Sequence, residues 1–101
     1  MLSVSQIQQT AEPIMQATNI TKLVLFGSYA KGTADKQSDI DICFFLDNYG
    51  GKERVDIIGE LLGLIRNGEY FEPIVFPTSE IQNDNPFVKE ILRTGIEIEL
   101  Q

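Results

Sequence analysis

The pattern of hydrophobic and polar residues predicts helices and strands in alternation along the chain. From Ser5 to about Thr18, apolar residues recur at helical spacing and predict a first helix, which Pro13 kinks or restarts. A short apolar run from Leu23 to Phe26 is closed by Gly27 and predicts a buried strand.

The clearest strand pattern follows a short helix and a loop. Ser28–Lys31 is long enough for one or two helical turns, and the polar segment Gly32–Ser38 is loop-like. The strand from Asp39 to Leu46 has two faces, of which one carries Ile40, Ile42 and Phe44 and the other Asp39, Asp41, Cys43 and Phe45.

The second half of the chain continues the alternation. Asp47–Gly51 is a turn cluster. An amphipathic helix follows, stopped by Asn67-Gly68, with its apolar face formed by Val55, Ile58, Leu61, Leu62 and Ile65. Tyr70–Phe76 reads as a third strand, in which Pro73 indicates an edge position or a bulge.

The last segments predict another helix and strand, and with them the fold class. Asp84-Asn85-Pro86 starts a helix with proline at its first position, and Gly95 ends it; its apolar face is Phe87, Val88, Ile91 and Leu92. Ile96–Leu100 alternates strictly and predicts a final strand with Glu97 and Glu99 outward. The order predicts a single domain, residues 1–101, of the α/β (or α+β) class, with a small mixed central sheet of about four strands flanked by helices.

Composition narrows the chemistry. A hydrophobic content of 43% excludes a disordered chain, and no apolar run is long enough to span a membrane. Eight basic and fifteen acidic residues give a net charge of −7, which disfavours general nucleic-acid binding. Because histidine is absent, histidine bases and most zinc sites are excluded. The single cysteine, Cys43, and the lack of a secretory pattern favour a cytoplasmic location.

A glycine-serine turn is the first candidate for chemistry. Gly27 and Ser28 follow a predicted strand and open a helix, where free backbone N–H groups suit a phosphate. The serine hydroxyl can contact a phosphate oxygen or cap the helix. Lys31 and Gly32 continue the turn, with Lys31 within reach of a triphosphate. The alternative is a plain strand-to-helix turn, and the segment is not a Walker loop.

A pair of aspartates is the second candidate. Asp39 and Asp41 emerge from the same face of a strand, about 6.6 Å apart along the backbone. Such carboxylates repel one another unless a cation such as Mg²⁺ lies between them. Two solvated residues on an outer face are the alternative, although apolar Cys43 and Phe45 share that face. A third carboxylate is expected from a neighbouring strand: Glu72, which interrupts an apolar run, with Glu69 as the other choice.

Together these segments resemble the minimal nucleotidyltransferase family of the DNA polymerase β-like nucleotidyltransferase superfamily. The resemblance rests on Leu25–Gly32, with its Gly-Ser turn and second glycine, and on Ser38-Asp39-Ile40-Asp41-Ile42 at the expected separation. It extends over the whole chain, since small members continue into a helix, a strand with an acidic residue, and a closing helix and strand.

The resemblance implies an activity and a set of site residues. Gly27 and Ser28 would hold the β- and γ-phosphates of a nucleoside triphosphate, and Asp39, Asp41 and Glu72 would be the catalytic, Mg²⁺-binding carboxylates. The nucleotide-binding set is completed by Lys31, Gly32 and Ser38. The expected reaction is transfer of AMP from ATP to a hydroxyl acceptor, with pyrophosphate leaving.

The chain also departs from the family pattern. The third carboxylate is usually aspartate, whereas Glu72 stands here beside a proline, which leaves catalysis less well supported than nucleotide binding. Many small members are antitoxins of toxin–antitoxin pairs that adenylylate a helical partner protein, so such a partner is expected, and a homodimer is an alternative. A catalytically weak nucleotide-binding module that regulates by complex formation is a second hypothesis, and a structural domain with an incidental pattern is a third.

Overall fold

Four strands form one mixed sheet in the computed structural model, which describes residues 5–7, 9, 20–35, 39–64 and 71–98. The strands are β1 (Ile20–Phe26), β2 (Ile40–Leu46), β3 (Phe71–Pro77) and β4 (Ile96–Ile98). Their order across the sheet is β3-β2-β1-β4. β1 is antiparallel to both of its neighbours, while β2 and β3 are parallel. The predicted mixed central sheet is confirmed.

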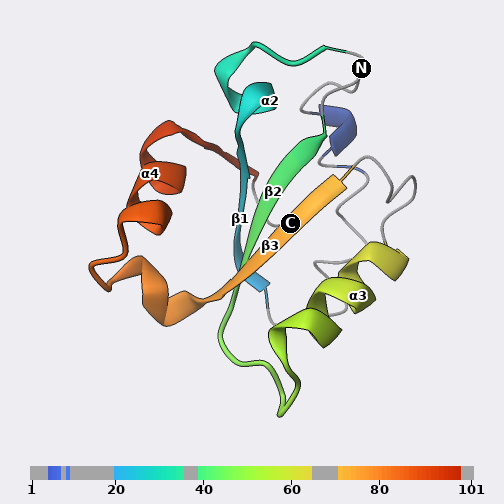
Figure 1. Ribbon diagram of the computed structural model, residues 1–101, viewed down its shortest axis with the longest axis vertical. Coiled ribbons are helices and arrows are strands. Elements are labelled where there is room, and N and C mark those ends of the chain that lie inside the picture. The colour runs from blue at the N-terminus through green and yellow to red at the C-terminus, as the bar shows by residue number, and fades with distance from the viewer. Residues whose placement is uncertain (1–4, 8, 10–19, 36–38, 65–70, 99–101) are drawn as a thin grey trace.

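Helices cover both faces of this sheet (Figure 1). Those with both ends among the described residues are α2 (Ser28–Lys31), α3 (Arg54–Leu64), the 3₁₀ helix η2 (Thr78–Ile81) and α4 (Pro86–Thr94). In Figure 1, η2 and α4 lie on one side of the strands and α3 lies on the other, with α2 beyond the end of β1. None of the helices in the described ranges has the length and apolar character that a membrane span requires.

Each face of the sheet carries its own apolar core. On the first face, the inward side chains of β2 pack with α3, and the buried residues include Ile40, Ile42, Phe44, Ile57 and Leu61. On the second face, α4 covers the middle of the sheet, and the buried residues are Val24, Cys43, Phe45, Val88 and Ile91. The face of β2 that carries Asp41 is therefore covered by a helix along most of its length, as the apolar character of Cys43 and Phe45 indicated.

The two ends of α4 fix its position on the sheet. At its start, the Asn85 side chain accepts hydrogen bonds from the backbone N–H groups of Phe87 (3.0 Å) and Val88 (3.3 Å), which caps the helix. At its end, Gly95 approaches β1 so closely that an added Cβ would overlap Val24 and lie 2.8 Å from the carbonyl oxygen of Leu25. The predicted helix start and stop are both confirmed.

Most predicted elements agree with the structure to within a few residues. β1 begins at Ile20, three residues before the predicted start, and Pro73 lies on edge strand β3, as predicted. η2 was not predicted. Ser5–Ile7 and Gln9 are helical, while the rest of the predicted first helix, the Asn67-Gly68 stop and Glu99 lie outside the described residues.

Each of the two predicted apolar helix faces includes one residue that the structure exposes, and the first also leaves out the buried Ile57. In α3 the buried residues are Ile57 and Leu61, whereas Val55, which was assigned to the apolar face, is 72% exposed. Residues 55 and 57 are about 200° apart on a helix, so they cannot share one narrow face. In α4, Val88 and Ile91 are buried but Phe87 is 50% exposed, because it lies about 100° around the helix from Val88, at the edge of the helix–sheet contact.

Candidate functional site

The turn after β1 has a backbone conformation that requires glycine. Gly27 has φ 70° and ψ −147°, a region that other residues essentially never occupy. Gly27 also lies directly against Asp41, because an added Cβ would overlap its Oδ2 atom and stand 3.1 Å from its Cγ. The glycine therefore serves two purposes: it turns the chain into α2 and leaves room for a carboxylate on the adjacent strand.

The remaining residues of the predicted phosphate turn form α2 and its end. Gly27 is the N-cap residue, so Ser28 is the first residue of the helix and does not cap it, which was one of its predicted roles. The N–H of Lys31 donates to the carbonyl of Gly27 (3.1 Å). Gly32 ends the helix in the left-handed conformation, and both Lys31 and Gly32 are exposed. Ser38 lies outside the described residues.

The aspartate pair occupies the start of β2. Asp39 immediately precedes the strand and is exposed, and Asp41, its second residue, is partly buried. Phe26, the last residue of β1, is the cross-strand partner of Asp41. The turn at Gly27 thus follows directly from the residue paired with Asp41, which is how the sheet brings the two halves of the motif together.

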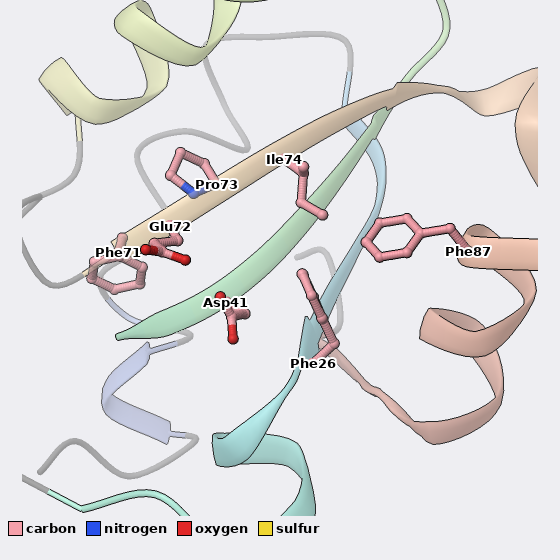
Figure 2. Close-up of a pocket in the computed structure, with 7 residues that line it drawn as sticks. All are labelled: Phe26, Asp41, Phe71, Glu72, Pro73, Ile74 and Phe87. Atoms are coloured by element: carbon pink, nitrogen blue, oxygen red, sulfur yellow. The ribbon is translucent and has the colours of Figure 1, made fainter. Parts of the chain in front are cut away.

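The predicted third carboxylate lies beside this pair. In the parallel register of β2 and β3, Glu72 is the partner of Asp41. Figure 2 shows the two carboxylates side by side on adjacent strands. Glu72 shares hydrogen bonds with both Asp39 and Asp41, although it is itself exposed. The structure therefore brings Asp39, Asp41 and Glu72 together, while Glu69, the other choice, lies outside the described residues.

Burial and the neighbouring carboxylates raise the pKa values of Asp41 and Glu72. Burial raises the pKa of Asp41 above its ordinary value, a hydrogen bond from Glu72 offsets part of this rise, and the charge of Asp39 adds to it. Hydrogen bonds to Asp39, together with the negative charge of that residue, raise the pKa of Glu72, and Asp41 acts in the same direction. Without a cation, Asp41 and Glu72 therefore bind a proton more readily than isolated carboxyl groups do.

This donor set suits a hard divalent cation. The ion pairs between described residues all lie elsewhere, so no lysine or arginine of those residues forms an ion pair with the three carboxylates. Carboxylate oxygens are the ligands that Mg²⁺ prefers, and a bound cation would offset the repulsion between these carboxylates. As they stand, however, no three acidic or cysteine side chains of the described ranges are spaced to ligate one ion. Coordination by all three carboxylates therefore requires a side-chain rotation, which exposed Glu72 is free to make.

A cleft of about 510 Å³ opens from the carboxylates toward α4. Its lining combines acidic and apolar side chains: Phe26, Asp41, Phe71, Glu72, Pro73, Ile74 and Phe87. In Figure 2, Phe26, Ile74 and Phe87 gather on the side of the cleft toward α4. The rings of Phe26 and Phe87 pack nearly perpendicular to one another, with their centroids 6.3 Å apart.

The apolar wall of this cleft was missed by the sequence prediction. Phe26 had been assigned to a buried strand and Phe87 to the apolar face of its helix. Phe26 carried a usable signal, since it directly precedes Gly27. Phe87 and Ile74 carried none, because their place beside Asp41 depends on the packing of α4 and on the parallel register of β3.

Comparison with known proteins agrees with this geometry. The family model described as "Polymerase beta, Nucleotidyltransferase" matches residues 8–100, so the chain belongs to the polymerase β-like nucleotidyltransferases. The crystal structure of a proposed nucleotidyltransferase from Sulfolobus solfataricus superposes with a TM-score of 0.68 at 21% sequence identity. The match covers 93% of this chain and 77% of that one, and it supports the nucleotidyltransferase fold. No curated protein sequence matches the chain significantly.

Proposed function

We propose that this chain is a Mg²⁺-dependent nucleotidyltransferase of the minimal type, which transfers AMP from ATP to an acceptor hydroxyl. The observation that carries the proposal is the meeting of a glycine turn and three carboxylates at one end of the sheet. The Gly27 backbone lies against Asp41, and Asp41 is paired with Glu72. A triphosphate on the turn would therefore lie next to the carboxylates that bind its metal.

The residues would divide the work as follows. Gly27 and Ser28 would present backbone N–H groups to the β- and γ-phosphates, where glycine permits close approach. Lys31, Gly32 and Ser38 are assigned to the same nucleotide site. Asp39 and Asp41 would bind Mg²⁺, with Glu72 as the third ligand. When bound, the metal would neutralise phosphate charge and orient the α-phosphate for in-line attack.

The proposed reaction is a single displacement at the α-phosphorus. The acceptor oxygen forms a bond to this phosphorus, and the bond from the phosphorus to the oxygen that bridges to the β-phosphate breaks. Pyrophosphate leaves with that electron pair, and the hydroxyl proton passes to the carboxylate of Glu72. Positioning of the two substrates supplies much of the rate in such a reaction.

The test incubates the purified protein with α-labelled ATP and an extract of the cells that produce it. The label transferred from ATP to a component of the extract is measured. Asp41→Asn preserves the shape of the side chain, and Asp47→Asn, an exposed residue just after β2, is the matched control. Because the change removes a metal ligand from the reacting centre, we expect label transfer to fall by about 100-fold or more in Asp41→Asn and to be unchanged in the control. Equal transfer by Asp41→Asn and wild type would contradict the proposal.

A second candidate is a nucleotide-binding module with weak catalysis. It is favoured by the exposure of Glu72 and by the absence, among the described residues, of three acids already spaced for one ion. The Glu72→Ala variant discriminates between the two functions. If Glu72→Ala loses label transfer but still binds Mg·ATP, the result supports the enzyme. If Glu72→Ala functions in cells as wild type does, the result supports the binding module.

The proposal also includes a biological setting. By resemblance to small members of the family, the chain would act in the cytoplasm as the antitoxin of a toxin–antitoxin pair and would modify a helical partner protein. A homodimer is the alternative assembly. Size-exclusion chromatography with light scattering, on the chain alone and after co-purification, distinguishes a heteromeric complex from a homodimer.

A further inference from the structure

The glycine turn adjoins Asp41 from β1, while the cleft extends from Asp41 across the β3 residues Glu72, Pro73 and Ile74 and on to Phe87 of α4. Gly27 follows Phe26, the partner of Asp41, and so lies toward the start of β2. Ile74 is paired with Cys43, one side chain further along the same face, and so lies toward α4. In Figure 2, α2 lies on one side of Asp41, and Ile74 and Phe87 lie on the other.

These positions relate the cleft to the proposed reaction. In an in-line displacement, the attacking and leaving oxygens lie on opposite sides of the α-phosphorus. If the leaving pyrophosphate is held at Gly27 and Ser28, the attacking hydroxyl must come from the side of Glu72. The cleft opens on that side, and its volume of about 510 Å³ is within the usual range for a small-molecule site.

The lining restricts the chemistry of a ligand. Among the described residues that line it, the charged members are Asp41 and Glu72, and the chain as a whole has a net charge of −7. A phosphorylated or carboxylated acceptor would therefore be repelled. The remaining lining is apolar, and Phe87, although it lines the cleft, is still 50% exposed. The exposed surface of the Phe87 ring, which lies beside acidic groups, favours a ligand whose main part is uncharged and apolar.

We propose that this cleft binds the acceptor as an alcohol or phenol with an uncharged, largely apolar body, a chemistry that a small molecule and a hydroxyl-bearing side chain of a partner protein share, and that Phe87 and Phe26 determine this specificity. The inference rests on the proposed function, since it gives the cleft the acceptor role in that reaction. The hydroxyl of the acceptor points toward Glu72, and its apolar part packs against Phe26, Ile74 and Phe87.

The test uses binding rather than turnover. Benzyl alcohol is titrated into the full chain with ¹³C-labelled isoleucine methyl groups, and the Ile74 signal is followed by NMR. Glycerol tests the need for an apolar body, and benzyl phosphate tests the need for an uncharged one. The variant is Phe87→Ala, and Val55→Ala is its control, because Val55 is an exposed apolar residue on α3, outside the cleft.

We expect benzyl alcohol to shift the Ile74 signal saturably in wild type and Val55→Ala, and to bind about two- to tenfold more weakly to Phe87→Ala. Glycerol and benzyl phosphate should bind more weakly than benzyl alcohol. Unchanged affinity in Phe87→Ala, or benzyl phosphate binding as well as the alcohol, would overturn the inference.

A parallel titration with Mg·ATP separates the two proposals. If Mg·ATP binds and benzyl alcohol does not, the acceptor inference fails while the proposed function stands. If benzyl alcohol binds at Ile74 and Mg·ATP does not bind at all, the proposed function fails, and the acceptor role of the cleft fails with it.

Discussion

Gly27 connects the two halves of the candidate site at the scale of single residues. Its φ of 70° and ψ of −147° exclude other residues, and its position against Asp41 excludes even a methyl group. The Gly-Ser sequence alone is common, and its importance here comes from this contact. In the proposed reaction, this close approach of the backbone to a carboxylate would let the turn and the carboxylates act on one substrate.

Gly27→Ala tests this connection. We expect the variant to lose about 1–3 kcal/mol of stability from backbone strain, and to lose Mg·ATP binding because the Asp41 carboxylate must move. Gly51→Ala is the control, since Gly51 also has a positive φ (79°) but no atom within 4 Å of the added Cβ. Thermal unfolding and calorimetric titration with Mg·ATP give the two readouts. If both variants bind Mg·ATP equally well, the contact with Asp41 is unimportant.

At the scale of elements, the start of α4 matters because it places Phe87 at the cleft. Asn85 caps this helix through two backbone N–H groups and also donates a hydrogen bond to Glu80 Oε2 (3.1 Å) in η2. The position of the aromatic wall therefore depends on a polar residue outside the core.

We expect Asn85→Ala to lower the free energy of unfolding by about 1 kcal/mol, the usual cost of losing an N-cap side chain. Asn83→Ala, an exposed asparagine two residues earlier, is the matched control and should change stability by less than about 0.5 kcal/mol. Urea denaturation of both variants measures the difference. Equal stability of the two would show that the cap contributes nothing.

The element pattern could largely be predicted because its signals are local. Pro73 indicated the edge strand, Asn85-Pro86 the start of α4, and alternation from Asp39 to Leu46 the central strand. The early start of β1 could not be predicted in this way, because Thr21 is polar and exposed and lies at an irregularity of the strand, where its neighbours Ile20 and Lys22 pair with β2. η2 has no comparable signal, since one turn of 3₁₀ helix is fixed mainly by its surroundings.

At the scale of the whole molecule, one apolar core covers each face of the sheet, while Asp39 and Glu72 at its acidic end are exposed. Cys43 belongs to the core under α4, and burial raises the pKa of its thiol to about 12 from the ordinary value of 9.0. The folded protein therefore retains this proton at alkaline pH, where the unfolded chain releases it. It follows that stability falls as pH rises above about 9.

Comparison with Cys43→Ala isolates this effect. The alanine variant lacks the thiol and therefore this pH dependence. Between about pH 8 and pH 10, the free energy of unfolding of wild type should fall by roughly 1.5 kcal/mol relative to that of Cys43→Ala. Denaturant unfolding at a series of pH values measures it. If the stability of the two proteins changes equally with pH, burial in the core does not raise the pKa of the Cys43 thiol.

The candidate site shows where sequence reasoning stops. Asp39 and Asp41 could be assigned because strand alternation puts both on one face. Glu72 could be named as a residue of a neighbouring strand, but its register beside Asp41 depends on the parallel pairing of β2 and β3. The cleft wall depends further on how α4 crosses the sheet, which no local pattern specifies.

The central claim is that Asp39, Asp41 and Glu72 bind a divalent metal next to a triphosphate held at Gly27. A crystal grown with ATP and Mn²⁺ and measured at the manganese absorption edge tests it most directly. The account predicts an anomalous peak in contact with Asp39 and Asp41, bridged to phosphates that lie on the Gly27-Ser28 turn. Nucleotide bound with its metal away from both aspartates would contradict it.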